Sequence, residues 1–115
     1  MYKRQLISAE YNHLPPPALI NLLNYFYAEF DRKPSCICTY SVGDFAGVRA
    51  QGPLRTLMTQ LGSPPIKLGM YQSRISKSLN EKGIPDDPVD TEKRFRIFFE
   101  ELVWYAKTLK AGRKV

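Results

Sequence analysis

Prolines divide this chain of 115 residues into short segments, each of which must form its own secondary structure. Prolines 15–17 end an N-terminal arm, residues 1–14, and suit the first turn of a helix, where backbone N–H groups have no partner anyway. Pro34 ends that helix, because a residue before proline avoids helical dihedral angles. Further breaks fall at residues 62–65 and 83–88, where glycine accompanies proline. These breaks predict four to five separate helices.

Apolar residues recur at helical spacing between the breaks. Residues 18–30 carry an apolar stripe, and residues 91–109 carry a wider one that follows a helix N-cap at Asp90. Two shorter helical patterns occupy residues 44–50 and 54–61. We expect the long C-terminal helix to pack in the core, in a dimer, or in both.

Residues 35–42 have the alternation of a β-strand, with β-branched and aromatic side chains that suit a pleated surface. Because one strand is not stable alone, its partner is either the arm near residues 5–8, in a two-stranded ribbon, or the same strand of a second subunit. The predicted fold class is therefore mainly α, a single-domain bundle of four to five helices with one short β-strand or ribbon.

Composition and length fit one globular domain spanning residues 1–115, with 43% apolar and 24% charged residues. The basic residues 110–115 are predicted to form a flexible tail. No apolar run reaches the ~20 residues that a membrane-spanning helix needs, and the N-terminus lacks the pattern of a signal peptide. We expect a protein that is not secreted and is cytoplasmic, or nuclear in a eukaryote.

Cysteine and histidine offer no catalytic or metal-binding pattern. Cys36 and Cys38 lack the spacing of zinc or redox motifs, and we interpret them as small core residues. His13 is the single histidine and has no nearby motif that would pair it with a nucleophilic thiol. The sequence thus predicts a protein that is not an enzyme, with no catalytic residues, no metal site and no cofactor.

Charge is distributed unevenly along the chain. The net charge is +6 and the isoelectric point about 9.4, which favours an anionic partner. No acidic residue lies between Asp44 and Glu81, and basic residues in that window are free of repulsion by carboxylates. Such a surface suits phosphate contact, because neutralising phosphates releases counterions. The basic residues of the window are Arg49, Arg55, Lys67, Arg74 and Lys77.

The stretch QSRISKSLNEKG, residues 72–83, resembles the recognition helix of helix-turn-helix DNA-binding domains. In this resemblance Gly69 takes the turn position and Ile75 the buried position six residues later; in a second register residues 54–61 form the first helix. The motif then occupies residues 54–83. The resemblance implies nucleic-acid contacts from Arg49, Arg55, Lys67, Tyr71, Gln72, Ser73, Arg74, Lys77 and Lys82, with Gln72, Ser73 and Arg74 as base readers.

The function predicted from these features is a small DNA-binding protein of regulatory or accessory type, acting in transcription as a homodimer on duplex DNA, with RNA as an alternative ligand. A second hypothesis is a non-enzymatic adaptor or inhibitor that docks on a larger protein through residues 91–109. Its interface residues are Phe98, Phe99, Trp104 and Tyr105. Neither hypothesis involves a membrane.

Overall fold

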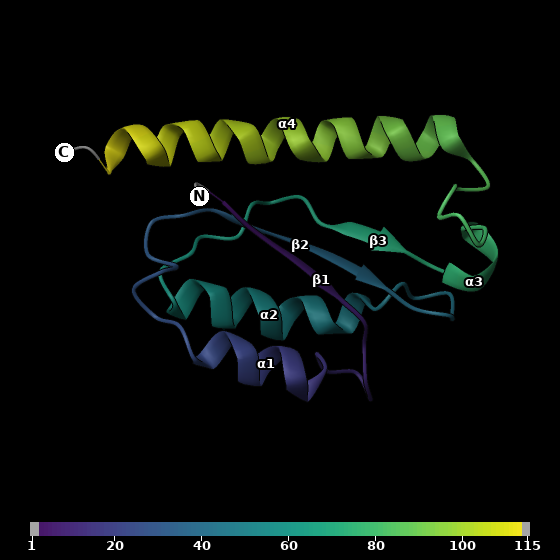
Figure 1. Cartoon of the computed structure of the whole chain (residues 1–115), viewed down its shortest axis with the longest axis horizontal. Coiled ribbons are helices and arrows are strands. Elements are labelled where there is room, and N and C mark those ends of the chain that lie inside the picture. The colour runs from purple at the N-terminus through teal and green to yellow at the C-terminus, as the bar shows by residue number, and fades with distance from the viewer. Residues whose placement is uncertain (1–2, 114–115) are drawn as a thin grey trace.

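Residues 3–113, which the computed structural model describes, form seven strands and helices (Figure 1). The strands are β1 (Arg4–Ser8), β2 (Ser35–Tyr40) and β3 (Met70–Gln72). The helices are α1 (Pro17–Asn24), α2 (Val48–Gln60), α3 (Ile75–Ser78) and α4 (Pro88–Gly112). Residues 1–2 of the predicted arm and 114–115 of the predicted tail lie outside the described residues. No helix in the described part is long and apolar enough to cross a membrane.

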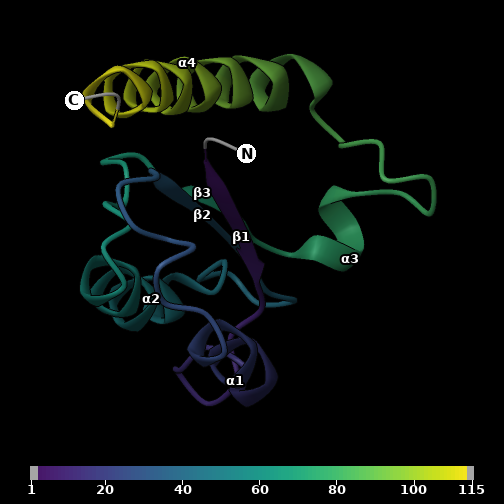
Figure 2. The ribbon, with the colours of Figure 1, turned by 60° about the vertical axis from the view of Figure 1, so that its left-hand side comes forward.

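The three strands form one parallel sheet in the order β1-β2-β3. Leu6 pairs with Ile37 in the first ladder, and Cys38 pairs with Met70 in the second. Parallel neighbours need a crossover of a dozen or more residues, and segments containing α1 and α2 supply the two crossovers. Both helices lie on one face of the sheet, and α4 covers the other (Figures 1 and 2).

Apolar side chains pack on both faces of this sheet. On the face of α1 and α2, Leu6 and Ile37 contact a buried cluster that includes Leu54 and Met58 of α2. On the opposite face, Phe98 and Leu102 of α4 pack with Cys36, Ile66 and Met70. Parallel sheets are stable when both faces are covered in this way, so the molecule has three layers, helix, sheet and helix.

The predicted mainly α bundle is wrong, because the fold is α/β. The strand at residues 35–42 was placed correctly, as β2 runs from Ser35 to Tyr40. Its partner in the arm is β1, but the two strands are parallel neighbours joined through α1 rather than a ribbon. Parallel partners lie far apart in the sequence, and β3 has three residues, too few for a pattern of alternation.

The segment predicted as a helix-turn-helix also folds differently. Where two helices were expected over residues 44–61, one helix, α2, continues through Pro53 because Leu54 and Met58 are completely buried beyond it. Residues 67–83 contain β3, then Arg74 in the left-handed conformation at φ 48°, then the four residues of α3. A long recognition helix is therefore not formed.

Candidate functional site

The carboxyl ends of all three strands meet at one edge of the sheet, because the strands are parallel. Ser8, Tyr40 and Gln72 are the last residues of β1, β2 and β3, and the chain leaves each of them into a loop. In open α/β sheets, ligands bind in the crevice outside these carboxyl ends. The arrowheads in Figure 1 mark this edge, which also faces α3.

The first loop, residues 9–16, contains a tight turn. Tyr11 and Leu14 exchange two backbone hydrogen bonds, with N···O distances of 2.8 and 3.0 Å. The two residues between them, Asn12 and His13, both have positive φ, at 51° and 68°, as in a type I′ turn. The turn leaves the Tyr11 side chain largely exposed at the edge of the sheet.

Glu10 ties the first loop to the beginning of α2. Its Oε2 accepts a hydrogen bond from the Arg49 backbone N–H at 3.0 Å, and its Oε1 lies 3.7 Å from the Arg49 guanidinium. The same guanidinium lies 4.7 Å from the centre of the Phe45 ring. Glu10 is mostly buried, so its carboxylate occupies the N-terminal end of α2, where a helix favours negative charge.

The second loop, residues 41–47, turns the chain from β2 into α2. Gly47 has a φ of +70°, and a Cβ there would lie 2.8 Å from the carbonyl oxygen of Tyr40. Residues 42–45 are exposed, and within residues 3–113 their backbone N–H groups donate no backbone hydrogen bond, whereas Ala46 and Gly47 are buried in the turn that leads into α2. Gly43 faces open space. The loop therefore presents unused backbone donors at the carboxyl edge.

Arg74 links this second loop to the end of β3. Its backbone N–H donates to the Gly43 carbonyl at 3.0 Å, and its guanidinium forms an exposed ion pair with Asp44. The hydrogen bond and the charge of Arg74 hold the pKa of Asp44 below its usual value. Ser41 completes the connection, because its carbonyl accepts from Ile75 at 3.0 Å. The loops after β2 and β3 are thus fixed to one another.

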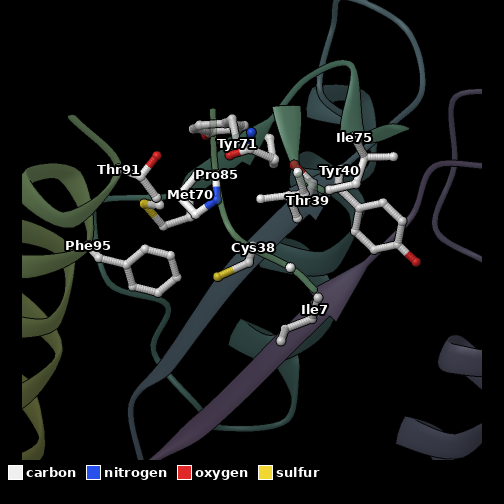
Figure 3. Close-up of a pocket in the computed structure, with 13 residues that line it drawn as sticks. Ile7, Cys38, Thr39, Tyr40, Met70, Tyr71, Ile75, Pro85, Thr91 and Phe95 are labelled. Carbon is white, nitrogen blue, oxygen red and sulfur yellow. The ribbon is translucent and has the colours of Figure 1, made fainter. Parts of the chain in front are cut away.

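An apolar groove of about 410 Å³ opens beside these loops, on the face of the sheet that α4 covers. Figure 3 shows the side chains of Cys38 and Phe95 directed toward one another in this groove. Burial raises the pKa of the Cys38 thiol, which keeps it neutral. Pockets with mainly apolar walls and a few polar groups suit small organic ligands. The groove is lined chiefly by Ile7, Cys38, Tyr40, Met70, Ile75 and Phe95.

The basic residues predicted to contact nucleic acid lie on several elements. Arg49 begins α2, and Arg55 donates to the carbonyls of Ile66 and Lys67 at 2.7 and 3.1 Å. Tyr71 and Gln72 are in β3, Ser73 and Arg74 follow it, Lys77 is in α3, and Lys82 lies in the turn after α3. The structure does not place these residues on one face of a single helix. Whether any of them contacts a ligand stays a prediction.

The residues predicted for a protein interface lie on α4, and part of them belongs to the core. Phe98 is buried against the sheet, and Phe99 and Tyr105 pack against the same cluster, whereas Trp104 is exposed. Sequence reasoning missed Glu10 and Tyr11 because it treated residues 1–14 as an arm, and it missed the second loop because it predicted a helix over residues 44–50. A signal was present in the glycines that follow the strand at residues 35–42.

Three layers around a parallel sheet, with polar loops gathered at its carboxyl edge, define an open α/β protein of the class that binds nucleotide or flavin cofactors there. The family model of NADPH-dependent FMN reductase matches residues 6–74. This match begins within β1 at Leu6, ends at Arg74, and includes all of β2 and β3. The chain belongs to the NADPH-dependent FMN reductase family.

A solved structure supports the flavodoxin-like α/β fold. It is FerB, a flavoenzyme NAD(P)H:(acceptor) oxidoreductase from Paracoccus denitrificans, with a TM-score of 0.70 and 18% sequence identity. The alignment covers 91% of this chain and 61% of FerB, so more than a third of FerB has no counterpart here. No curated protein matches the chain.

These findings overturn the functional predictions made from the sequence. The chain matches a flavin reductase family and has the fold of a flavoenzyme. The predicted helix-turn-helix, the predicted DNA-binding role in transcription and the predicted adaptor docking through residues 91–109 are therefore wrong. The family is one of enzymes, so the prediction of a non-enzyme is wrong. The predicted partners, duplex DNA and a larger protein, are overturned with those roles, and the comparisons do not show an oligomeric state for the predicted homodimer.

Proposed function

We propose that residues 1–115 take part in flavin-dependent oxidoreduction, in which electrons pass from NAD(P)H to an acceptor. The observation that carries this proposal is the family match over residues 6–74, since these residues build the carboxyl edge of the sheet. FerB, which is described as a flavoenzyme that uses NAD(P)H, has the same fold over 91% of this chain. A bound flavin accepts a hydride and passes on the two electrons.

The loops at the carboxyl edge fit the ring system of a flavin. This ring is flat, with an apolar end and an end that carries carbonyl oxygens and ring nitrogens. The free N–H groups of residues 42–45 supply donors for the polar end, and Gly43 leaves room for its approach. The exposed Tyr11 ring offers an aromatic face beside them. We assign ring binding to these two loops.

Two ion pairs would hold these loops in position. Glu10 and Arg49 fix the first loop against α2, and Asp44 and Arg74 fix the second loop against the end of β3. Loops that are held in this way lose less freedom on binding, which favours affinity. Glu10, Arg49, Asp44 and Arg74 are therefore positioning residues in this proposal.

A binding titration with a matched pair of tyrosine variants tests the proposal. FMN is titrated with the 115-residue chain while flavin fluorescence is measured, and NADPH oxidation is followed in the same samples. Tyr11→Ala should weaken FMN binding about three- to tenfold, since an aromatic pair contributes about 0.5–1.5 kcal/mol. Tyr25→Ala, an exposed tyrosine at the C-terminal end of α1, should have no effect.

Either of two results would count against flavin binding at this edge. The first is unchanged flavin fluorescence at every protein concentration. The second is equal weakening by both tyrosine variants, because that would place the flavin away from the first loop.

We also propose that the chain acts as one domain in the cytoplasm. Cys36 and Cys38 are free thiols on the same strand, which suits a reducing compartment. Measuring one cooperative unfolding transition and the location of a tagged protein in cell fractions tests both statements.

A further inference from the structure

We infer that residues 1–115 recognise the ring of a flavin and not its phosphate, so that this chain binds riboflavin as tightly as FMN. The inference rests on the proposed function. A flavin phosphate is a dianion at neutral pH, and proteins bind such groups with free N–H groups at a helix N-terminus or with unpaired cations. We therefore consider each of these groups at the carboxyl edge.

Among residues 15–20, at the N-terminus of α1, Ala18 alone has an N–H group without a hydrogen bond, and a single donor does not form a cradle for a phosphate. Pro15 and Pro16 precede the helix and Pro17 is its first residue, so these three positions have no N–H group. The N–H groups of Leu19 and Ile20 already donate to the Pro16 carbonyl, at 3.0 and 3.3 Å. The first loop also lacks the glycines that let a backbone approach a phosphate closely.

The N-terminus of α2 already holds an anion, the carboxylate of Glu10. The Arg49 N–H donates to Glu10, while the N–H groups of Val48 and Ala50 donate to the carbonyls of Phe45 and Gly47 at 2.9 and 3.1 Å. A phosphate at this helix end would have to displace Glu10 or lie beside it. Two anions in contact repel one another, so the position is closed to FMN phosphate.

Two of the cations at this edge are matched by carboxylates, and the third, Lys77 of α3, forms no ion pair within residues 3–113 and is therefore tested below. Arg49 is paired with Glu10, and Arg74 is paired with Asp44. The free N–H groups of residues 42–45 lie in the same loop as Asp44, whose carboxylate opposes a dianion. These donors therefore suit the neutral carbonyl oxygens of a flavin ring better than a phosphate.

The strand order gives an independent reason. In flavodoxin-like folds, FMN lies at the point where the strand order reverses. Among residues 3–113 the order β1-β2-β3 runs in one direction and contains no reversal. These residues thus form one side of a cofactor crevice, the side that carries the two ring-binding loops.

Parallel titrations of riboflavin and FMN with the 115-residue chain test the inference. Flavin fluorescence is read at pH 8 in low and in high salt. The expected dissociation constants agree within about threefold, and salt leaves their ratio unchanged, because a phosphate contact would be screened. FMN binding more than about tenfold tighter than riboflavin binding, with a preference that salt removes, would overturn the inference.

A matched pair of charge variants sharpens the result. Glu10→Gln removes the anion from the N-terminus of α2 and should raise the affinity for FMN relative to riboflavin about threefold, because the helix end then favours phosphate. Glu92→Gln on the exposed side of α4 should leave the ratio unchanged. If Lys77→Ala lowers the affinity for FMN alone in the otherwise native chain, a phosphate contact from α3 exists and the inference fails.

The outcomes separate this inference from the proposed function. A strong preference for FMN refutes ring-only recognition and leaves flavin binding in place. Absence of binding by both flavins refutes the inference and the proposed function together. Equal binding of both flavins supports both.

Discussion

Gly47 is the residue whose replacement should most disturb the carboxyl edge. Alanine at this left-handed position costs about 1–2 kcal/mol in backbone strain. Its Cβ would also lie 2.8 Å from the Tyr40 carbonyl oxygen and 3.2 Å from the Thr39 Cβ, so the beginning of α2 would have to move away from β2. We expect Gly47→Ala to lower the free energy of unfolding by about 2 kcal/mol or more.

Gly52→Ala is the matched control within the same helix. A Cβ at Gly52 meets no atom within 4 Å, and alanine in a helix interior is favoured over glycine by about 0.5–1 kcal/mol. The two variants should therefore differ by about 2–3 kcal/mol in opposite directions from the parent.

Urea unfolding followed by circular dichroism measures this difference. With a slope of about 1–3 kcal/mol per molar urea, the two midpoints should be separated by about 1 M or more. Equal midpoints for Gly47→Ala and Gly52→Ala would refute the reasoning, because they would mean that the loop tolerates a side chain at Gly47.

Four further predictions concern packing and charge. Phe98→Ala should destabilise the protein by about 3–5 kcal/mol in urea unfolding, whereas Trp104→Ala, at an exposed position, should change stability little. Burial raises the pKa of Cys36 to about 12 and also raises that of Cys38, so the fully buried Cys36 thiol should resist a maleimide reagent at pH 7 until urea unfolds the chain, whereas Cys38, which lines the groove, should react first. Because the folded state keeps these protons, the thiols' contribution to stability should be complete below about pH 9 and fall as pH rises toward 12, which urea midpoints across that range would show. Asp44→Asn should raise FMN affinity relative to riboflavin, since it frees the Arg74 guanidinium, and an unchanged ratio in the fluorescence titration would contradict this.

Local patterns in the sequence located several elements. The helix predicted at residues 91–109 lies within α4, and the prolines at 15–17 do precede α1. Apolar spacing succeeds here because it reports which face of one helix is buried. The helix predicted through Phe30 ends at Asn24, although Phe30 is buried in the core, so apolar spacing did not reveal that helical hydrogen bonding stops earlier.

The sheet could not be derived from such patterns. β1 was hidden in a presumed arm, and β3 lies in a polar stretch that looked like a helix. Pairing between parallel strands depends on residues more than thirty positions apart, as Leu6 and Ile37 show. Local spacing carries no information about such partners, and an α/β sheet was interpreted as a helical bundle.

The candidate site was missed for a related reason. Its groups are backbone N–H donors of residues 42–45 and an ion pair between Glu10 and Arg49, which are 39 residues apart. Residue types do not reveal which backbone N–H groups lack a hydrogen-bond partner. The ion pair forms only when the parallel strands bring both loops to one edge of the sheet. The basic residues between Asp44 and Glu81 were easier to recognise in the sequence and suggested a site for an anion. In the structure, however, Arg49 and Arg74 form ion pairs with carboxylates.

The most direct test of the account is to locate a bound flavin by NMR. Amide resonances of the ¹⁵N-labelled chain are followed as riboflavin and, separately, FMN are added. The account predicts that both flavins shift the amides of residues 9–14 and 42–47 and leave the exposed side of α4 around Trp104 unchanged. Shifts confined to α4, or none with either flavin, would contradict a flavin site at the carboxyl edge of the sheet.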